Sequence, residues 1–126
     1  MEKAKVWLRQ DGILQIDLSG IKHLKLPIME DIYQQHIAIS QEKLQILFTG
    51  GSILGYDKEA VSYVSSAKVC ALTSSAAILT HSKLEQYLGR MFLWYTPPPF
   101  PVKLFSNEED AINWLKMLNS AKSNIA

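Results

Sequence analysis

The chain carries three histidines and one cysteine, the residue types that most often bind metals or act as nucleophiles. His23, His36 and His81 are far apart in the sequence, and none belongs to a two-histidine ligand motif. Cys70 lies in the apolar run 69–72, so we expect a small, unreactive core residue. A single cysteine allows neither an internal disulfide nor a cysteine-based zinc cluster. The sequence therefore predicts no metal site.

Two acidic clusters and one glycine-rich segment are the other candidates for chemistry. Glu30–Asp31 and Glu108–Asp110 each fall in the expected first turn of a helix, where the helix dipole favours carboxylates without any catalytic role. The segment 50–55 follows a predicted strand, as phosphate loops do, but it lacks both glycine-rich nucleotide motifs. We interpret it as a turn, with a small anion or a phosphorylated group near the next helix as the alternative. We therefore expect no enzyme, no catalytic residue and no cofactor.

Length and charge limit the remaining classes of function. With 126 residues and 48% hydrophobic residues, residues 1–126 fit one globular domain. Thirteen basic against twelve acidic residues leave a net charge of +1, which argues against nucleic acid as a partner. The longest uncharged runs are far shorter than the roughly 20 residues that span a bilayer, and no signal peptide is visible. We expect a cytoplasmic protein without a transmembrane segment.

The first half of the chain predicts a hairpin, a helix and a strand. Residues 6–9 and 14–18 are the two strands of the hairpin, joined at Asp11-Gly12, a dipeptide typical of tight turns. Pro27 fits the first turn of a helix over 27–41, with an apolar stripe at Ile28, Ile32 and Ile39, flanked by Met29 and His36. Residues 44–48 follow as a buried strand.

The second half predicts three helices that alternate with two strands. Asp57 is expected to cap a helix through its carboxylate, and 76–79 and 102–105 are the strands. Ser82–Glu85 and Ser106–Glu109 each form a capping box at the start of a helix. The buried faces of the three helices are expected to carry, in order, Ala60, Val61, Val64 and Ala67; Leu84, Leu88, Met91, Phe92 and Tyr95; and Ala111, Ile112, Leu115 and Leu118. Pro97–Pro99 ends the middle helix, and 119–126 is expected to fray.

This order of elements predicts an α/β fold. It is a mixed four- to five-stranded sheet with an N-terminal β-hairpin as its antiparallel edge and about four helices packed against it.

One surface stands out as a candidate for interactions. In the helix that begins at Ser82, Tyr87, Arg90 and Trp94 share the face opposite the apolar stripe, and Phe100 follows shortly after the prolines. Exposed aromatic residues beside arginine are enriched at protein interfaces, and the same pattern suits a membrane surface. The alternative is that another part of the chain covers them.

The closing segment of the chain resembles a known family. Residues 105–115 read Phe-Ser-Asn-Glu-Glu-Asp-Ala-Ile-Asn-Trp-Leu, similar to the last strand and helix of STAS-like, SpoIIAA-like small bacterial proteins. The preceding helix, which ends in Phe92 and Trp94 before the prolines, looks similar too, and the resemblance covers about residues 5–118. It implies a sheet of four or five strands covered by helices, mostly without enzymatic activity.

The resemblance also implies a site that this chain does not fully match. In the anti-sigma-factor antagonists of that family, a serine at the start of the second helix is phosphorylated by a partner kinase. The matching stretch 53–59 holds no serine; Asp57 stands at the helix start, and Ser52 and Tyr56 are the nearest hydroxyls. The phosphorylation switch is therefore not carried over. Other relatives are related to the Sec14-type lipid-binding fold.

Together these observations predict a non-enzymatic interaction or regulatory module for a protein partner or a homodimer. Its candidate surface consists of Ser52, Tyr56, Asp57, Tyr87, Arg90, Trp94 and Phe100. The alternative is a carrier of a small apolar ligand or lipid, or a protein that binds a membrane surface.

Overall fold

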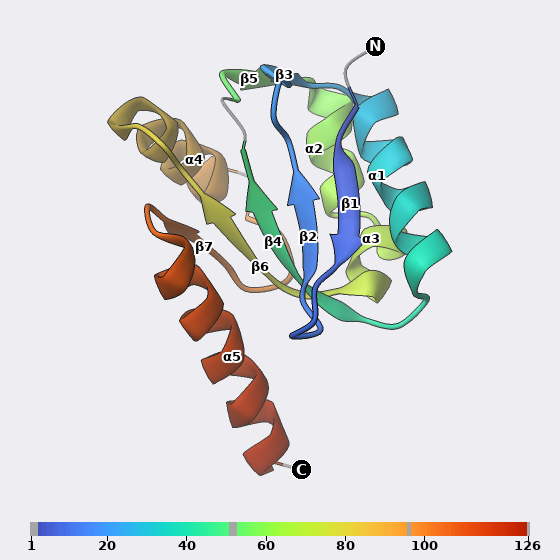
Figure 1. Cartoon of the computed structure of the whole chain (residues 1–126). Helices are drawn as coiled ribbons and strands as arrows, with labels where there is room; N and C mark the ends of the chain where they lie inside the picture. Colours follow the sequence, from blue (N-terminus) through green and yellow to red (C-terminus); the bar gives the residue numbers. More distant parts are fainter. Residues whose placement is uncertain (1–2, 51–52, 96, 126) are drawn as a thin grey trace.

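A five-stranded mixed sheet forms the centre of the computed structural model, which describes residues 3–50, 53–95 and 97–125 (Figure 1). The strand order is β1-β2-β4-β6-β7. Their bounds are β1 Lys5–Leu8, β2 Leu14–Asp17, β4 Leu44–Thr49, β6 Thr73–Leu79 and β7 Val102–Phe105. The β1–β2 pair is antiparallel and the other pairs are parallel, so the predicted hairpin edge and mixed sheet are confirmed.

The hairpin turn forms as the sequence predicts. Gly12 has a φ of +86°, a backbone conformation that suits glycine, and the Asp11 carboxylate accepts the Ile13 backbone N–H at 3.1 Å. These local interactions fix the register of β1 against β2, in which Val6 lies opposite Ile16.

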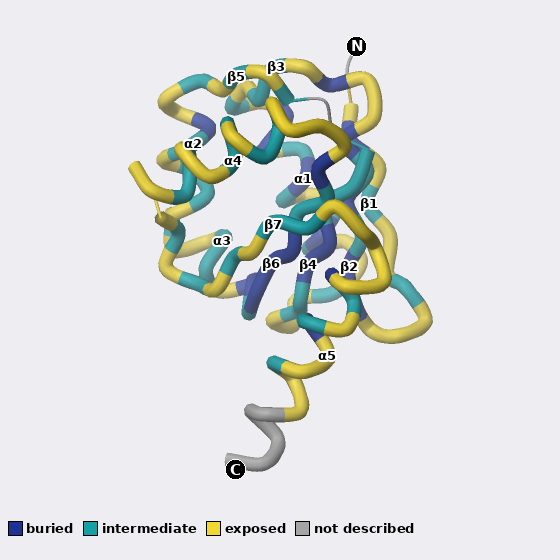
Figure 2. Tube along the Cα trace, turned by 90° about the vertical axis from the view of Figure 1, so that its left-hand side faces the viewer, coloured by how far each residue is buried: buried dark blue, intermediate teal, exposed yellow. Residues whose placement is uncertain are grey.

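Helices cover both faces of the sheet. Alternate residues of its inner strands point to opposite faces, and apolar residues on both faces need a covering layer. In β6, Ala76 belongs to the larger apolar core and Ala77 to a second core on the opposite face. The helices are α1 Leu26–Ile39, α2 Lys58–Val64, α3 Ala67–Leu72, α4 Lys83–Tyr95 and α5 Glu108–Ile125. The second core packs under α5 through Ala111 and Leu115 (Figures 1 and 2).

The helix expected after Asp57 is interrupted. Ser65 ends α2, and Ser66 takes an extended conformation before α3 begins, since serine readily leaves helical geometry. Cys70 therefore lies in α3 and is half-buried rather than a core residue, with its Sγ 3.8 Å from the Ser65 carbonyl oxygen. In the predicted apolar face Ala60 is buried, whereas Ala67 is exposed.

Two short strands were not predicted. β3 (His23–Leu24) and β5 (Gly55–Tyr56) pair in parallel as a separate small sheet beside the start of α1 (Figure 1). Strands of two residues are too short to show a period in the sequence, so only the fold reveals them.

Two expectations about helix faces and ends are wrong. Ile39 in α1 is exposed, and Met29 and His36 complete the buried face instead. Asn107 rather than Ser106 caps α5, since the Asp110 backbone N–H donates to the Asn107 side-chain oxygen at 3.2 Å. The same helix runs to Ile125, and fraying of 119–126 stays a prediction.

The capping box of α4 is confirmed, but its predicted buried face is not. The Ser82 hydroxyl accepts the Glu85 backbone N–H at 3.1 Å, and the Glu85 carboxylate accepts the His81 N–H at 2.6 Å. No residue of α4 is fully buried among those described, and Leu84 and Tyr95 are 57% and 74% exposed. The helix stands away from the sheet, which leaves a space beneath it.

Candidate functional site

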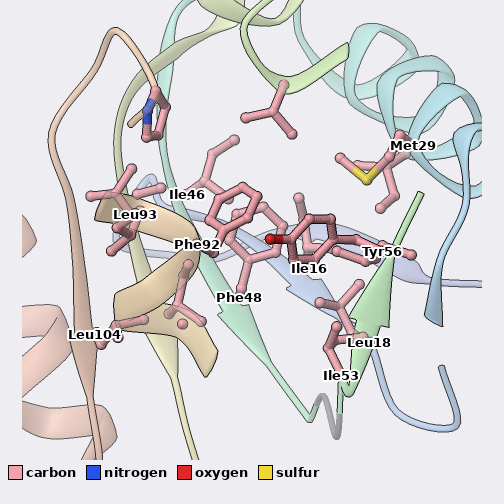
Figure 3. A pocket seen from close by; sticks show the side chains of 18 of the residues that line it. Ile16, Leu18, Met29, Ile46, Phe48, Ile53, Tyr56, Phe92, Leu93 and Leu104 are labelled. Carbon is pink, nitrogen blue, oxygen red and sulfur yellow. The ribbon is translucent and has the colours of Figure 1, made fainter. Parts of the chain in front are cut away.

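An apolar cavity of about 350 Å³ lies between one face of the sheet and helices α1 to α4. Aliphatic and aromatic side chains form almost all of its wall (Figure 3). The sheet contributes Ile16 and Leu18 from β2 and its end, Ile46 and Phe48 from β4, and Ala76 and Ile78 from β6. The small side chain of Ala76, in the middle of the sheet, leaves room that a larger residue would fill.

Helix α4 forms the roof of the cavity. Leu88, Phe92 and Leu93 line it from this side, and Figure 3 shows Phe92 and Leu93 beside the space. Gly89 brings the helix close to β7, because a Cβ there would lie 3.0 Å from a methyl carbon of Leu104. The helix thus packs closely against β7, and on its other side Phe92 contacts Tyr56 of β5.

The opposite wall comes from α1 and α3. Met29, Ile32 and His36 of α1 and Leu72 of α3 all line the cavity. His36 is buried, and burial lowers the pKa of its imidazole below the usual value. Its Nε2 has no hydrogen-bond partner within the described part of the chain, so protonation of this ring would be costly.

The opening of the cavity is marked by residues that line it and are also exposed. These are Leu54, Tyr56, Met91 and Tyr95, from the segment that includes β5 and from α4. Trp94 stacks on Tyr95 with ring centroids 6.3 Å apart and is 82% exposed. We call these five residues the mouth rim.

Asp57 supports the mouth rim instead of capping α2. Its position as the N-cap of α2 is confirmed, but its carboxylate makes no capping hydrogen bond to the helix. The Asp57 Oδ1 lies 2.7 Å from the Nε2 of His23, and the Asp57 backbone N–H donates to the Leu24 carbonyl. These contacts bind β5 to β3 and so hold Tyr56 in place.

The structure separates the seven candidate surface residues into groups. Tyr56 is exposed at the cavity mouth with half-exposed Asp57 beside it, and Tyr87, Arg90 and Trp94 are exposed on α4. Phe100 is half-buried, packs against the larger core and lines the cavity, so it does not extend the exposed surface. Ser52 lies outside the described residues.

The cavity itself was missed by the sequence analysis. Phe92 and Leu88 were recognised as apolar positions, but the residue pattern of a filled core and that of a cavity wall are the same. The one visible signal was the excess of large apolar residues on α4, more than a single buried stripe requires.

The described residues offer neither a cluster of metal ligands nor a membrane-spanning helix. In residues 3–50, 53–95 and 97–125, no group of three or more His, Cys, Asp or Glu residues could hold a metal ion. None of the helices described is both long enough and apolar enough to cross a bilayer.

Solved structures with this architecture are known. A protein of the DUF3478 family from Shewanella loihica PV-4, described as uncharacterized with a SpoIIAA-like fold, superimposes with a TM-score of 0.61. The two share 18% identity over 89% of this chain and 91% of that one. The SpoIIAA-like fold expected from the sequence is thereby confirmed.

Other comparisons define the family without adding a function. A protein of unknown function from Arthrobacter sp. FB24 is 19% identical over 89% of this chain and 98% of that one, with a TM-score of only 0.32. No curated protein matches the chain significantly. The family model described as "Domain of unknown function (DUF7793)" matches residues 6–119, so the chain belongs to that family.

Proposed function

We propose that this member of the DUF7793 family binds a small apolar ligand of fatty-acid size in the cavity beneath α4. The cavity is the observation that carries the proposal, because its wall is apolar from the sheet to the helix roof. Pockets for small molecules are typically mostly apolar and measure about 300–1,000 Å³. This cavity falls within that range.

The size of the cavity supports an occupant. The apolar side chains around an unfilled cavity lack packing partners on one side, which lowers the stability of the fold. Water is a poor substitute, since it needs polar partners and this wall offers few besides His36, Glu85 and threonine hydroxyls. An apolar guest would recover much of the lost contact energy.

The volume also sets the class of guest. A water-sized unit occupies about 30 Å³ of liquid, so the cavity holds at least about a dozen heavy atoms. A medium-length acyl chain has this size and the required apolar character. Its polar end would remain at the mouth beside Tyr56, where water is accessible.

The polar groups in the cavity wall are more consistent with ligand binding than with catalysis. The imidazole of His36 is buried on α1, and the carboxylate of Glu85 on α4 already accepts the His81 N–H. Neither is paired with the other as an acid and a base. A non-enzymatic role and a cytoplasmic location stay predictions.

Titration with a fluorescent polyene fatty acid tests the proposal. The wild type should raise the fluorescence in a saturable way, and Ala76→Phe, which places a ring in the cavity, should weaken binding by at least about tenfold, or about 1.4 kcal/mol. The control is Ala38→Phe, because Ala38 is exposed on α1 and lies outside the cavity wall. If Ala76→Phe fails to fold, the smaller Ala76→Leu serves instead. If the wild type does not bind the fatty acid, or if Ala76→Phe and Ala38→Phe bind it equally well, the cavity is not the binding site.

A second function is supported by the outer face of α4. Tyr87 is 60% exposed and Arg90 is exposed one turn later, which is the composition of a protein interface. We propose as the alternative that this face binds a protein partner or a second copy. Sedimentation of wild type and Tyr87→Ala across concentration should then show weaker association in the variant.

A further inference from the structure

The mouth rim exposes large apolar side chains at the point where an apolar ligand must enter. Leu54, Tyr56, Met91 and Tyr95 belong at once to the cavity wall and to the exposed surface, so the apolar surface continues from the interior to the outside. Trp94 extends this surface by stacking on Tyr95. A cavity that received its ligand from water would gain nothing from an apolar rim.

We infer that the mouth rim docks onto a lipid bilayer, from which the cavity takes up its ligand. This inference rests on the proposed function and deepens it, since it names the source of the apolar guest. Molecules of this class partition into membranes, so a mouth that sits on the membrane surface spares the ligand an aqueous step. The rim would enter the interfacial region while the rest of the domain stays outside it.

The chemistry of the rim suits an interface between water and lipid. Tryptophan and tyrosine, which have an apolar ring and a polar tip, are the residues enriched at membrane interfaces. Two exposed basic residues adjoin the mouth rim: Arg90 precedes Met91, and the backbone carbonyl of Lys22 accepts the Leu54 backbone N–H.

The extent of the rim favours a bilayer over a second copy of the chain. A fully buried aromatic side chain removes about 150–250 Å² from water, so five partly exposed side chains offer roughly 600 Å². Stable protein pairs bury about 800 Å² on each partner. A bilayer needs no such area, because each inserted side chain contributes independently.

Co-sedimentation with vesicles of phosphatidylcholine and phosphatidylglycerol tests this inference. The wild type should partition onto the vesicles, and Trp94→Ser, which removes the most exposed side chain of the mouth rim, should lose at least about tenfold in partitioning. Trp7→Ser is the matched control, because Trp7 is a partly exposed tryptophan on β1, at the opposite edge of the sheet from β7. The control should bind vesicles as the wild type does.

The fatty-acid titration separates this inference from the proposed function. Trp94→Ser and Trp7→Ser should bind the free fluorescent fatty acid as tightly as the wild type, since neither tryptophan lines the cavity. A wild type that binds the fatty acid but not vesicles would refute the docking surface and leave the cavity function intact. Equal vesicle binding by Trp94→Ser and the wild type would also refute it, as would a stable wild-type dimer that Trp94→Ser dissociates.

Discussion

The ring of Tyr56 meets the ring of Phe92 edge to face, with centroids 5.1 Å apart and planes inclined by 78°. Tyr56 belongs to β5 and Phe92 to α4, so this contact crosses the mouth of the cavity (Figure 3). Aromatic pairs of this geometry contribute about 0.5–1.5 kcal/mol beyond the area they bury. A contact of this size is comparable to thermal energy, so the two rings can separate on thermal motion.

Removing the Tyr56 ring should therefore change the rate of ligand exchange more than the stability of the fold. For Tyr56→Ala we expect a loss of about 1–3 kcal/mol of unfolding free energy, from the aromatic pair and the buried part of the ring, and a severalfold faster release of the fluorescent fatty acid. Stopped-flow dilution measures the release. Tyr56→Phe keeps the ring and should behave as the wild type, and an unchanged release rate in Tyr56→Ala would show that the mouth lies elsewhere.

Two neighbouring alanines of β6 offer a matched test of the empty space. Ala76 faces the cavity and Ala77 faces the packed core under α5, although both are almost fully buried. Ala76→Leu should leave stability unchanged or raise it, whereas Ala77→Leu should cost about 1–3 kcal/mol through overpacking. Chemical denaturation measures both. Equal destabilisation of the two variants would mean that the cavity is not available to side chains.

His36 predicts a specific dependence of stability on pH. Burial lowers the pKa of His36 in the folded protein from 6.5, so the unfolded chain binds the proton more readily than the folded one. Stability should consequently fall as the pH is lowered through about 6.5 toward the folded-state pKa, and it should be fully present above that range. Urea unfolding at a series of pH values above 5 measures this.

The variant His36→Leu should remove most of that decline and should also abolish the unpartnered ring nitrogen. His81→Gln is the control, since His81 is exposed and should leave the decline intact. A pH profile that is the same in wild type and His36→Leu would contradict this account of His36.

The contact between His23 and Asp57 should contribute modestly, because both side chains are nearly half exposed. A double-mutant cycle of His23→Ala and Asp57→Ala should give a coupling free energy of about 0.2–1 kcal/mol. Thermal unfolding of the four proteins measures the coupling. A coupling free energy of zero, with a loss of unfolding free energy only in Asp57→Ala, would instead support the helix-capping role that the sequence suggested.

The sequence predicted the sheet well because its signals are local. The turn at Asp11-Gly12 and the alternation of Leu14 and Ile16 define the hairpin without help from distant residues. The SpoIIAA-like fold was expected from the resemblance of the closing strand and helix to that family, and it is confirmed. The exposure of Tyr87 and Trp94 was also predicted from the helical period alone.

The site was harder to predict, because it depends on distances between elements. The Leu84–Tyr95 stripe has the period of a buried helix face, yet α4 touches the sheet mainly at Gly89 and Leu104 and stands off elsewhere. The partner of Asp57 lies 34 residues away, on a strand of two residues that carries no periodic signal. A helix that roofs a cavity and one that completes a core therefore look alike in sequence.

Methyl NMR tests the central claim, that the cavity beneath α4 binds an apolar ligand, most directly. The protein, labelled at its isoleucine methyl groups, is titrated with a saturated medium-chain fatty acid. Ile16, Ile46 and Ile78 line the cavity, whereas Ile13 and Ile112 belong to the core under α5 on the opposite face. The account predicts saturable shifts of the first three methyl signals with little change in the other two. No shift in the cavity isoleucines, or equal shifts in both sets, would contradict it.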